Sequence, residues 1–328
     1  MRRRTSFAFA AFGPAILCVA APRARGQPTE PKSEAGDARR VLLAAPEAAP
    51  RLSFFHAALE VPPMQAAWTL PRGASFAELT STHALSTDQQ EIDGVHNRFD
   101  GIFHEWLAAD LRWGVAPDVE IGARVAYAGW DEHNDCFDLF DAGGNFIVSD
   151  EDQHLSGDAT GRHDNVSDVV LRGKVVLLED DTETSALALA GSVKIPVARA
   201  RDLTNAGTVD VTTTLVASRR WGDFALHANL GVGVPLGEEN LFEDEANVEL
   251  EPFVHGGLGG TWLLAEDFSL SLQLEANSSA FEDVEFLEDF LGARRFFGDV
   301  LVEAGAGVGL VSSSSYDYEF LVGVGYLF

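Results

Sequence analysis

Short rows of apolar residues that alternate with small or polar ones recur along this chain from Ala74 to Phe328. A period of two is typical of a β-strand whose two faces meet different surroundings. Several rows extend over about 9–11 residues, the length of a tilted strand that crosses a bilayer. The pattern predicts an all-β chain. It is either an up-and-down antiparallel transmembrane β-barrel with lipid outside or a sandwich with the apolar rows in its core.

The polar faces of these rows carry charges, and charge is costly toward lipid, so in a barrel we expect these side chains to point inward. Glycines on the same faces, such as Gly122, Gly305 and Gly307, are expected to leave room inside. We predict that the strand charges line the lumen and set its selectivity. The candidates are Arg112, Glu120, Arg124, Asp168, Arg172, Lys174, Glu275 and Glu303.

The connections alternate between short and long, as in outer-membrane barrels with short periplasmic turns and long external loops. Both ends of such barrels normally lie in the periplasm, so the strand number is even. A twelfth strand is expected at 286–296, and a strand within 52–70 is the alternative. The eleven obvious strands are 74–85, 101–113, 118–128, 167–178, 185–195, 208–218, 223–235, 249–263, 267–278, 299–310 and 318–328.

The first residues read as a signal peptide, 1–26. Arg2, Arg3 and Arg4 precede an apolar block from Phe7 to Ala21, and Ala24-Arg25-Gly26 is a small-x-small cleavage site. Residues 27–51, rich in Pro, Ala and Glu, are expected to form a periplasmic linker with little structure. The barrel would occupy 52–328, in the outer membrane of a Gram-negative bacterium.

Composition excludes several classes of protein. The chain has 23 Lys and Arg against 51 Asp and Glu, a net charge of −28. Cleavage of the signal peptide would remove five of these arginines and make the charge more negative. Such a charge repels nucleic acid. Only Cys136 would remain after cleavage, so no intrachain disulfide can form. No later apolar run is long enough for a transmembrane helix.

The residues with chemical potential do not form a recognisable active site. The acidic segment from Trp130 to Val166 contains three histidines, but it lacks a calcium-loop or zinc-ligand spacing. A solvated loop is the simpler interpretation, and divalent-cation binding the alternative. No G-x-S-x-G motif is present. We therefore expect no catalytic residue, no metal site and no cofactor.

The end of the chain resembles the assembly signal of outer-membrane barrels. Phe320, Tyr326 and Phe328 alternate along the final row, and the last residue is aromatic. The resemblance implies the barrel assembly machinery as a partner, with outer-membrane lipid and lipopolysaccharide around the barrel.

Several segments resemble a bacterial outer-membrane family known as domain of unknown function 3187. They are Ala66–Gly73, the strand-turn-strand Leu111–Gly122, Phe137–Phe140 with Gly143-Gly144, and Ser192–Pro196 with its Lys-x-Pro. The chain lacks the His of the family's Phe-His-Asp loop opening. Its ending also resembles porin-like barrels described as putative phenol-degradation-pathway transporters. The resemblance implies a barrel over 52–328 and assigns no substrate.

The sequence thus favours a porin-like passive channel for small solutes. One alternative is a non-conducting structural or surface-binding barrel whose acidic loops bind cations. A lipid hydrolase at the lumen rim is a further alternative.

Overall fold

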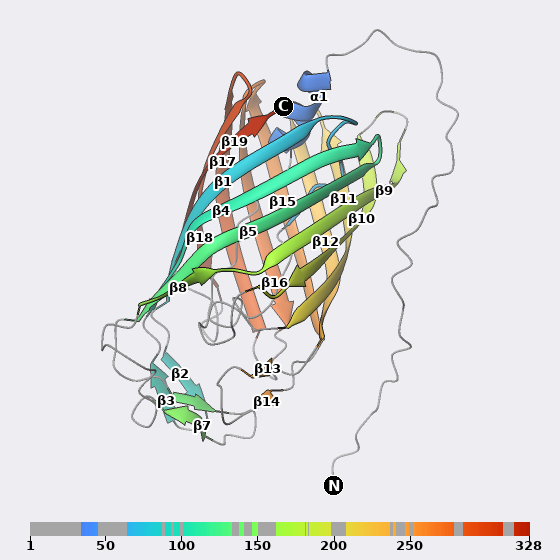
Figure 1. The fold of residues 1–328 in the computed structure, drawn as a ribbon. Coiled ribbons are helices and arrows are strands. Elements are labelled where there is room, and N and C mark those ends of the chain that lie inside the picture. Colours follow the sequence, from blue (N-terminus) through green and yellow to red (C-terminus); the bar gives the residue numbers. More distant parts are fainter. Residues whose placement is uncertain are drawn as a thin grey trace. The chain divides into compact units, whose positions relative to one another are not determined.

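Twelve antiparallel strands form one closed sheet, a β-barrel (Figure 1). Strands that follow one another along the chain pair all round the ring, and the ladder between β1 and β19 closes it. The predicted up-and-down antiparallel transmembrane barrel is confirmed, and the sandwich alternative is wrong. The structure is a computed structural model that describes residues 34–44, 64–86, 89–92, 95–98, 101–132, 138–140, 146–149, 162–180, 182, 184–197, 208–236, 239–240, 247–248, 252–278, 285–310 and 318–328.

The barrel strands begin and end close to the predicted positions. They are β1 (Ser75–Ser86), β4 (Gly101–Ala116), β5 (Val119–Glu132), β9 (Val169–Glu179), β10 (Ser185–Ile195), β11 (Val209–Trp221), β12 (Phe224–Leu236), β15 (Phe253–Ala265), β16 (Phe268–Ser278), β17 (Glu285–Phe297), β18 (Val300–Gly309) and β19 (Tyr318–Leu327).

The twelfth strand is β17, where the sequence alternates poorly. Phe290 and Phe296 point inward and are only 4% exposed, on the same face as Arg294. Large aromatic residues on an inner face obscure the expected pattern of polar inside and apolar outside. The alternative strand within 52–70 is wrong for residues 64–70, which are not in a strand, and residues 52–63 lie outside the described part.

The two faces of the strands meet opposite surroundings. Leu189 and Leu272 point outward and are 38% and 59% exposed, while Ser192 and Gln273 point inward and are 6% and 1% exposed. These assignments agree with the predicted alternation. The exposed apolar side chains of all twelve strands therefore form the outer surface, as lipid contact requires.

Short turns connect the strands at one end of the barrel, called here the short-turn end. Gly222 and Gly298 occupy two of these turns with φ of +61° and +66°, a left-handed conformation that side chains disfavour. The opposite, long-loop end carries three small ladders and one strand that extends the pairing of β5. These elements are β2 (Gln89–Ile92) with β3 (Val95–Arg98), β6 (Asp138–Phe140) with β7 (Phe146–Ser149), β13 (Glu239–Asn240) with β14 (Asn247–Val248), and β8 (Arg162–Val166).

An α-helix, α1 (Glu34–Ala44), packs at the short-turn end, where the sequence predicts little structure. This expectation is wrong for residues 34–44, and the rest of 27–51 lies outside the described residues. Ala38 and Leu42, one helical turn apart, are buried together with Leu43. Composition suggested a linker, but the inward apolar residues of neighbouring strands give this short helix a surface to pack on. No helix in the described part is long and apolar enough to span a membrane.

Chain also fills the barrel interior before the first strand. Residues 64–70 run inside the barrel, with Ala67 and Leu70 fully buried. Leu70 joins α1 and the strand ends in one apolar cluster at the short-turn end. The remaining members of this cluster are Ala38, Leu42, Leu43, Phe76, Phe296, Leu301 and Leu327. The lumen is therefore occupied in part by an inner segment (64–70), and α1 packs at one of its ends.

Candidate lumen site

All eight charged residues selected from the sequence are buried or half-buried; seven lie on barrel strands, and Asp168 lies directly before β9. They do not form one group. Four of them line a single cavity: Arg112, Glu120, Arg172 and Lys174. Four lie elsewhere on the inner wall: Arg124, Asp168, Glu275 and Glu303.

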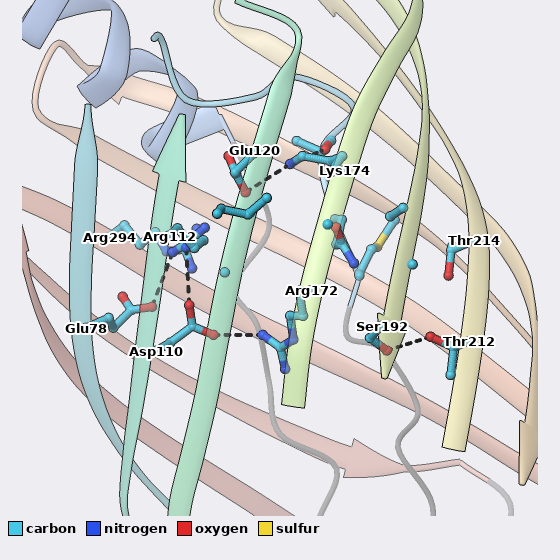
Figure 2. A pocket seen from close by; sticks show the side chains of 18 residues that line it. Glu78, Asp110, Arg112, Glu120, Arg172, Lys174, Ser192, Thr212, Thr214 and Arg294 are labelled. Atoms are coloured by element: carbon cyan, nitrogen blue, oxygen red, sulfur yellow. Dashed lines mark hydrogen bonds and ion pairs between the residues drawn. The ribbon is translucent and has the colours of Figure 1, made fainter. Parts of the chain in front are cut away.

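Ion pairs of alternating sign run across the wall from β1 to β9 (Figure 2). Arg112 Nη2 lies 3.4 Å from Glu78 Oε2, and its Nε lies 3.6 Å from Asp110 Oδ1. Arg172 Nη1 donates to the other carboxylate oxygen of Asp110 at 2.7 Å. The order is therefore acid, base, acid, base. We call this set, Glu78, Arg112, Asp110 and Arg172, the charge ladder.

The ladder crosses β5 at a glycine. Gly122 pairs with Arg112 on one side and with Arg172 on the other. Because Gly122 has no side chain, Asp110 on β4 can reach Arg172 on β9 over the intervening strand. We expected this glycine to leave open space, and in the structure the ion pair between Asp110 and Arg172 occupies that space.

Other inner-face glycines are also filled. A Cβ built at Gly305 or Gly307 would meet the ring of Phe290. The expectation that these glycines leave the lumen open is therefore wrong. They make room for an aromatic ring packed against the wall.

The inner segment is hydrogen-bonded to the same wall. The Leu70 amide donates to Glu120 Oε2 at 2.9 Å, and Lys174 Nζ donates to the Ala66 carbonyl oxygen at 3.2 Å. Lys174 also lies 3.6 Å from Glu120 Oε1. Because these two side chains satisfy backbone groups of the inner segment, they fix its position next to the ladder.

A cavity of about 80 Å³ remains between the inner segment and the wall. On one side the charge ladder lines it, and on the other the hydroxyls of Ser192, Thr212 and Thr214 (Figure 2). This volume has room for a few water molecules. The charged and hydroxyl groups of this lining can hold a small polar molecule.

A Ser-His pair holds the inner segment on the opposite wall. Ser218 Oγ lies 2.8 Å from His227 Nδ1 and accepts from the Ala67 amide at 2.8 Å. The Trp68 ring meets the His227 ring edge-on, with centroids 5.8 Å apart. Ser218 and His227 are 4% and 0% exposed. Within the described residues His227 has no ion pair to a carboxylate that would orient it as a base, so the pair fits an anchor for the inner segment better than a nucleophile and its base.

Two candidates from the sequence are held in ion pairs away from the cavity. Arg124 contacts Glu105, and Glu303 accepts from Arg294 Nε at 2.8 Å. Arg294 also donates to the Leu42 carbonyl oxygen at 3.2 Å, which ties the end of α1 to the wall. Glu303 thus serves mainly to neutralise Arg294.

Asp168 belongs to a buried trio near the long-loop end. Lys194 Nζ lies 3.5 Å from Asp168 and 2.7 Å from Asp210. Thr208 Oγ1 donates to Asp210 at 2.8 Å, and the Val197 amide donates to Asp168 at 3.2 Å. Glu275, the remaining candidate, pairs across strands with Glu288 on β17.

Three charged residues that line the cavity were not among the candidates from the sequence: Glu78, Asp110 and Arg294. Asp110 and Arg112 are two residues apart on one strand, so period-two alternation would have placed both inside. Glu78 lies on β1 with Phe76 and Thr80, in an inward row that is less regular than the others. Thr212 and Thr214, whose hydroxyls also line the cavity, were not among the candidates selected from the sequence.

The aromatic residues at the chain end lie on the outer surface. Phe320, Tyr326 and Phe328 are 58%, 45% and 71% exposed. The Phe328 amide donates to the Ser75 carbonyl oxygen at 2.8 Å, so the last residue takes part in closing the ring. Their role in assembly stays a prediction.

Most of the acidic segment predicted as a solvated loop, from Trp130 to Val166, lies outside the described residues. Within the described ones, no group of three or more His, Cys, Asp or Glu side chains could hold a metal ion. The cation-binding alternative is therefore untested.

The barrel is similar to solved outer-membrane proteins. The COG4313 outer membrane channel from Pseudomonas putida F1 superposes with a TM-score of 0.62 at 14% identity, over 82% of this chain and 100% of that chain. The NanC porin superposes with a TM-score of 0.46 at 9% identity, over 76% of this chain and 98% of that chain. The translocator domain of the autotransporter NalP from Neisseria meningitidis superposes with a TM-score of 0.44 at 12% identity, over 77% of this chain and 88% of that chain. At such identities the first likeness shows the fold alone, and the other two are too distant to add to it. No family model and no curated protein matches the chain.

Proposed function

We propose that this protein is a porin-like channel of the outer membrane that passes small solutes through a narrow lumen. The observation that carries the proposal is the charged cavity inside a barrel whose outer surface is apolar. A wall of ion pairs that faces a small polar space offers a hydrated solute charged and hydrogen-bonding groups along its path. A barrel with only a structural role would have little use for these charges.

The outer surface supports a place in the membrane. Trp113, Trp221 and Trp262 lie beside short turns and are 49%, 49% and 58% exposed. Exposed aromatic residues near one end of the strands match the girdle that such barrels carry at the membrane–water interface. The expected signal peptide and the resemblance to domain of unknown function 3187 favour the same location. Lipid, lipopolysaccharide and the assembly machinery are then its proposed partners, and divalent cations at the acidic loops a further one.

The lumen sets a limit on what passes. Twelve strands lie between eight, which enclose only their own side chains, and sixteen, which leave an aqueous channel. Here the inner segment and α1 fill much of that interior. We therefore expect a small conductance, with the apolar cluster around Leu42 as the main barrier.

The second candidate, a non-conducting barrel, is favoured by that same apolar cluster at the short-turn end. The two candidates differ in what happens when α1 is removed. If α1 only narrows the exit of a channel, its removal should increase the conductance. If the inner segment seals the barrel, the barrel should stay non-conducting after α1 is removed.

Planar-bilayer recording of the refolded protein distinguishes them. We expect discrete small current steps in wild type and larger steps in a variant without residues 34–44. The matched control is Leu189→Ala on the outer face, which should conduct as wild type does. Folded, inserted protein that carries no current, with or without residues 34–44, would overturn the proposal and favour the structural barrel.

A further inference from the structure

The cavity beside the charge ladder offers both signs of charge in equal number. Three basic and three acidic side chains line it. A fourth basic side chain, Arg294, also lines it, but its charge is neutralised by Glu303, whose Oε2 accepts from Arg294 Nε at 2.8 Å. An anion in this space would meet the acids as well as the bases, and a cation would do the same. The wall therefore selects neither sign of ion strongly. The six residues are Glu78, Asp110, Glu120, Arg112, Arg172 and Lys174.

Polar atoms of the ladder are left without hydrogen bonds. Within the described residues, Glu78 Oε1, Asp110 Oδ1 and Arg112 Nε are buried and have no hydrogen-bond partner. The 3.6 Å between Arg112 Nε and Asp110 Oδ1 is an ion-pair distance and too long for a hydrogen bond. The Glu78 side chain is only 3% exposed. Buried polar atoms normally have partners, so these three indicate a molecule that would complete them.

The chemistry of these three atoms without hydrogen-bond partners defines the molecule that would complete them. Two carboxylate oxygens, on Glu78 and Asp110, need a donor, for which an ammonium group is the best match. One guanidinium N–H, on Arg112, needs an acceptor, for which a carboxylate is the best match. A ligand that meets both demands carries an ammonium and a carboxylate.

The remaining lining limits its size. Ser192 and Thr212 lie opposite the ladder with their hydroxyls 2.6 Å apart, and Ala190 is the small residue beside them. A space of about 80 Å³ excludes a large side chain. It suits the smallest amino acids.

We infer that this cavity is a recognition site for small zwitterions, the smallest α-amino acids, as they pass through the lumen. The inference rests on the proposed channel function. Its test separates selectivity from conduction.

Glycine and its uncharged isomer glycolamide are the probes, because they have the same atoms and differ in charge distribution. Proteoliposomes in an isosmotic solution of either solute swell at the rate of influx, corrected with protein-free vesicles. We expect protein-dependent influx of glycine to exceed that of glycolamide roughly tenfold, the ratio that one charge-assisted contact can supply.

Glu78→Gln/Arg112→Gln removes one acid and one base, so the net charge stays the same. In this variant we expect the preference for glycine to fall close to unity while the potassium chloride current persists. Leu189→Ala, on the outer face, should keep the preference. Heat-dependent gel mobility verifies that each variant is folded.

Wild type that carries potassium chloride current yet shows equal influx of both probes would overturn the zwitterion site and leave the channel standing. Wild type with neither current nor influx would overturn the channel itself and the site with it. A Glu78→Gln/Arg112→Gln variant that folds and keeps the full preference would also refute the site.

Discussion

Neighbouring residues on one strand of this barrel face opposite sides, the outer surface and the interior. Leu272 is 59% exposed on the outer face, and Gln273, the next residue, is 1% exposed inside. Period-two alternation was enough to predict this difference, because it depends only on the pleat of the strand. It could not predict which charges meet. Asp110 reaches Arg172 only because the register places Gly122 between their strands.

Leu272→Arg should destabilise the barrel by about 2–4 kcal/mol, since it places a cation against the acyl chains. Gln273→Arg should cost much less, because its neighbour Glu275 on the same inner face can balance the charge. Folding titrations into lipid vesicles measure both. Equal costs at the two positions would refute the assignment of the faces.

Arg294→Met should destabilise the protein by roughly 3–5 kcal/mol, because it leaves the Glu303 carboxylate buried without its cation. The side chains of this pair are only 2% and 1% exposed, so water cannot replace the lost partner. Adding Glu303→Gln should recover much of the loss. Urea unfolding in vesicles measures the free energy of unfolding of both variants. If the double variant is no more stable than Arg294→Met, the pair is not the source of the effect.

At the scale of elements, the strands were predictable and the inner chain was not. Every barrel strand carries its own alternation, whereas α1 and the inner segment are ordered by surfaces contributed by strands far away in the sequence. Ala67, for example, donates to Ser218, and the carbonyl of Leu42 accepts from Arg294. Such contacts have no local signature.

Deletion of Phe328 should reduce the fraction of chains that assemble, because it removes a terminal ring-closing hydrogen bond to Ser75 together with an exposed terminal aromatic. Heat-modifiable mobility of the membrane fraction measures assembly. Val322→Ala, an outward change on the same strand, is the control and should assemble well. Equal assembly of the two would argue against a role for the chain end.

For the molecule as a whole, the ion pairs revise the expected selectivity. Sequence reasoning proposed that strand charges set it, yet each of Arg112, Arg124, Arg172 and Lys174 lies beside a lumen carboxylate. We therefore expect a reversal potential close to zero in a salt gradient. Arg172→Gln should shift it toward cations, because Asp110 then loses a counter-charge. A strong preference in wild type would contradict this balanced wall.

Cysteine modification during single-channel recording tests the central claim, that solutes pass through this lumen. In a Cys136→Ser background, Ser192→Cys places a thiol at the cavity, and Val193→Cys places one on the outer face, where the native side chain is 37% exposed. A charged, membrane-impermeant methanethiosulfonate reagent should reduce the current of the first variant and leave that of the second unchanged. A current that is equally insensitive in both variants, although mass spectrometry shows Ser192→Cys modified, would contradict the account.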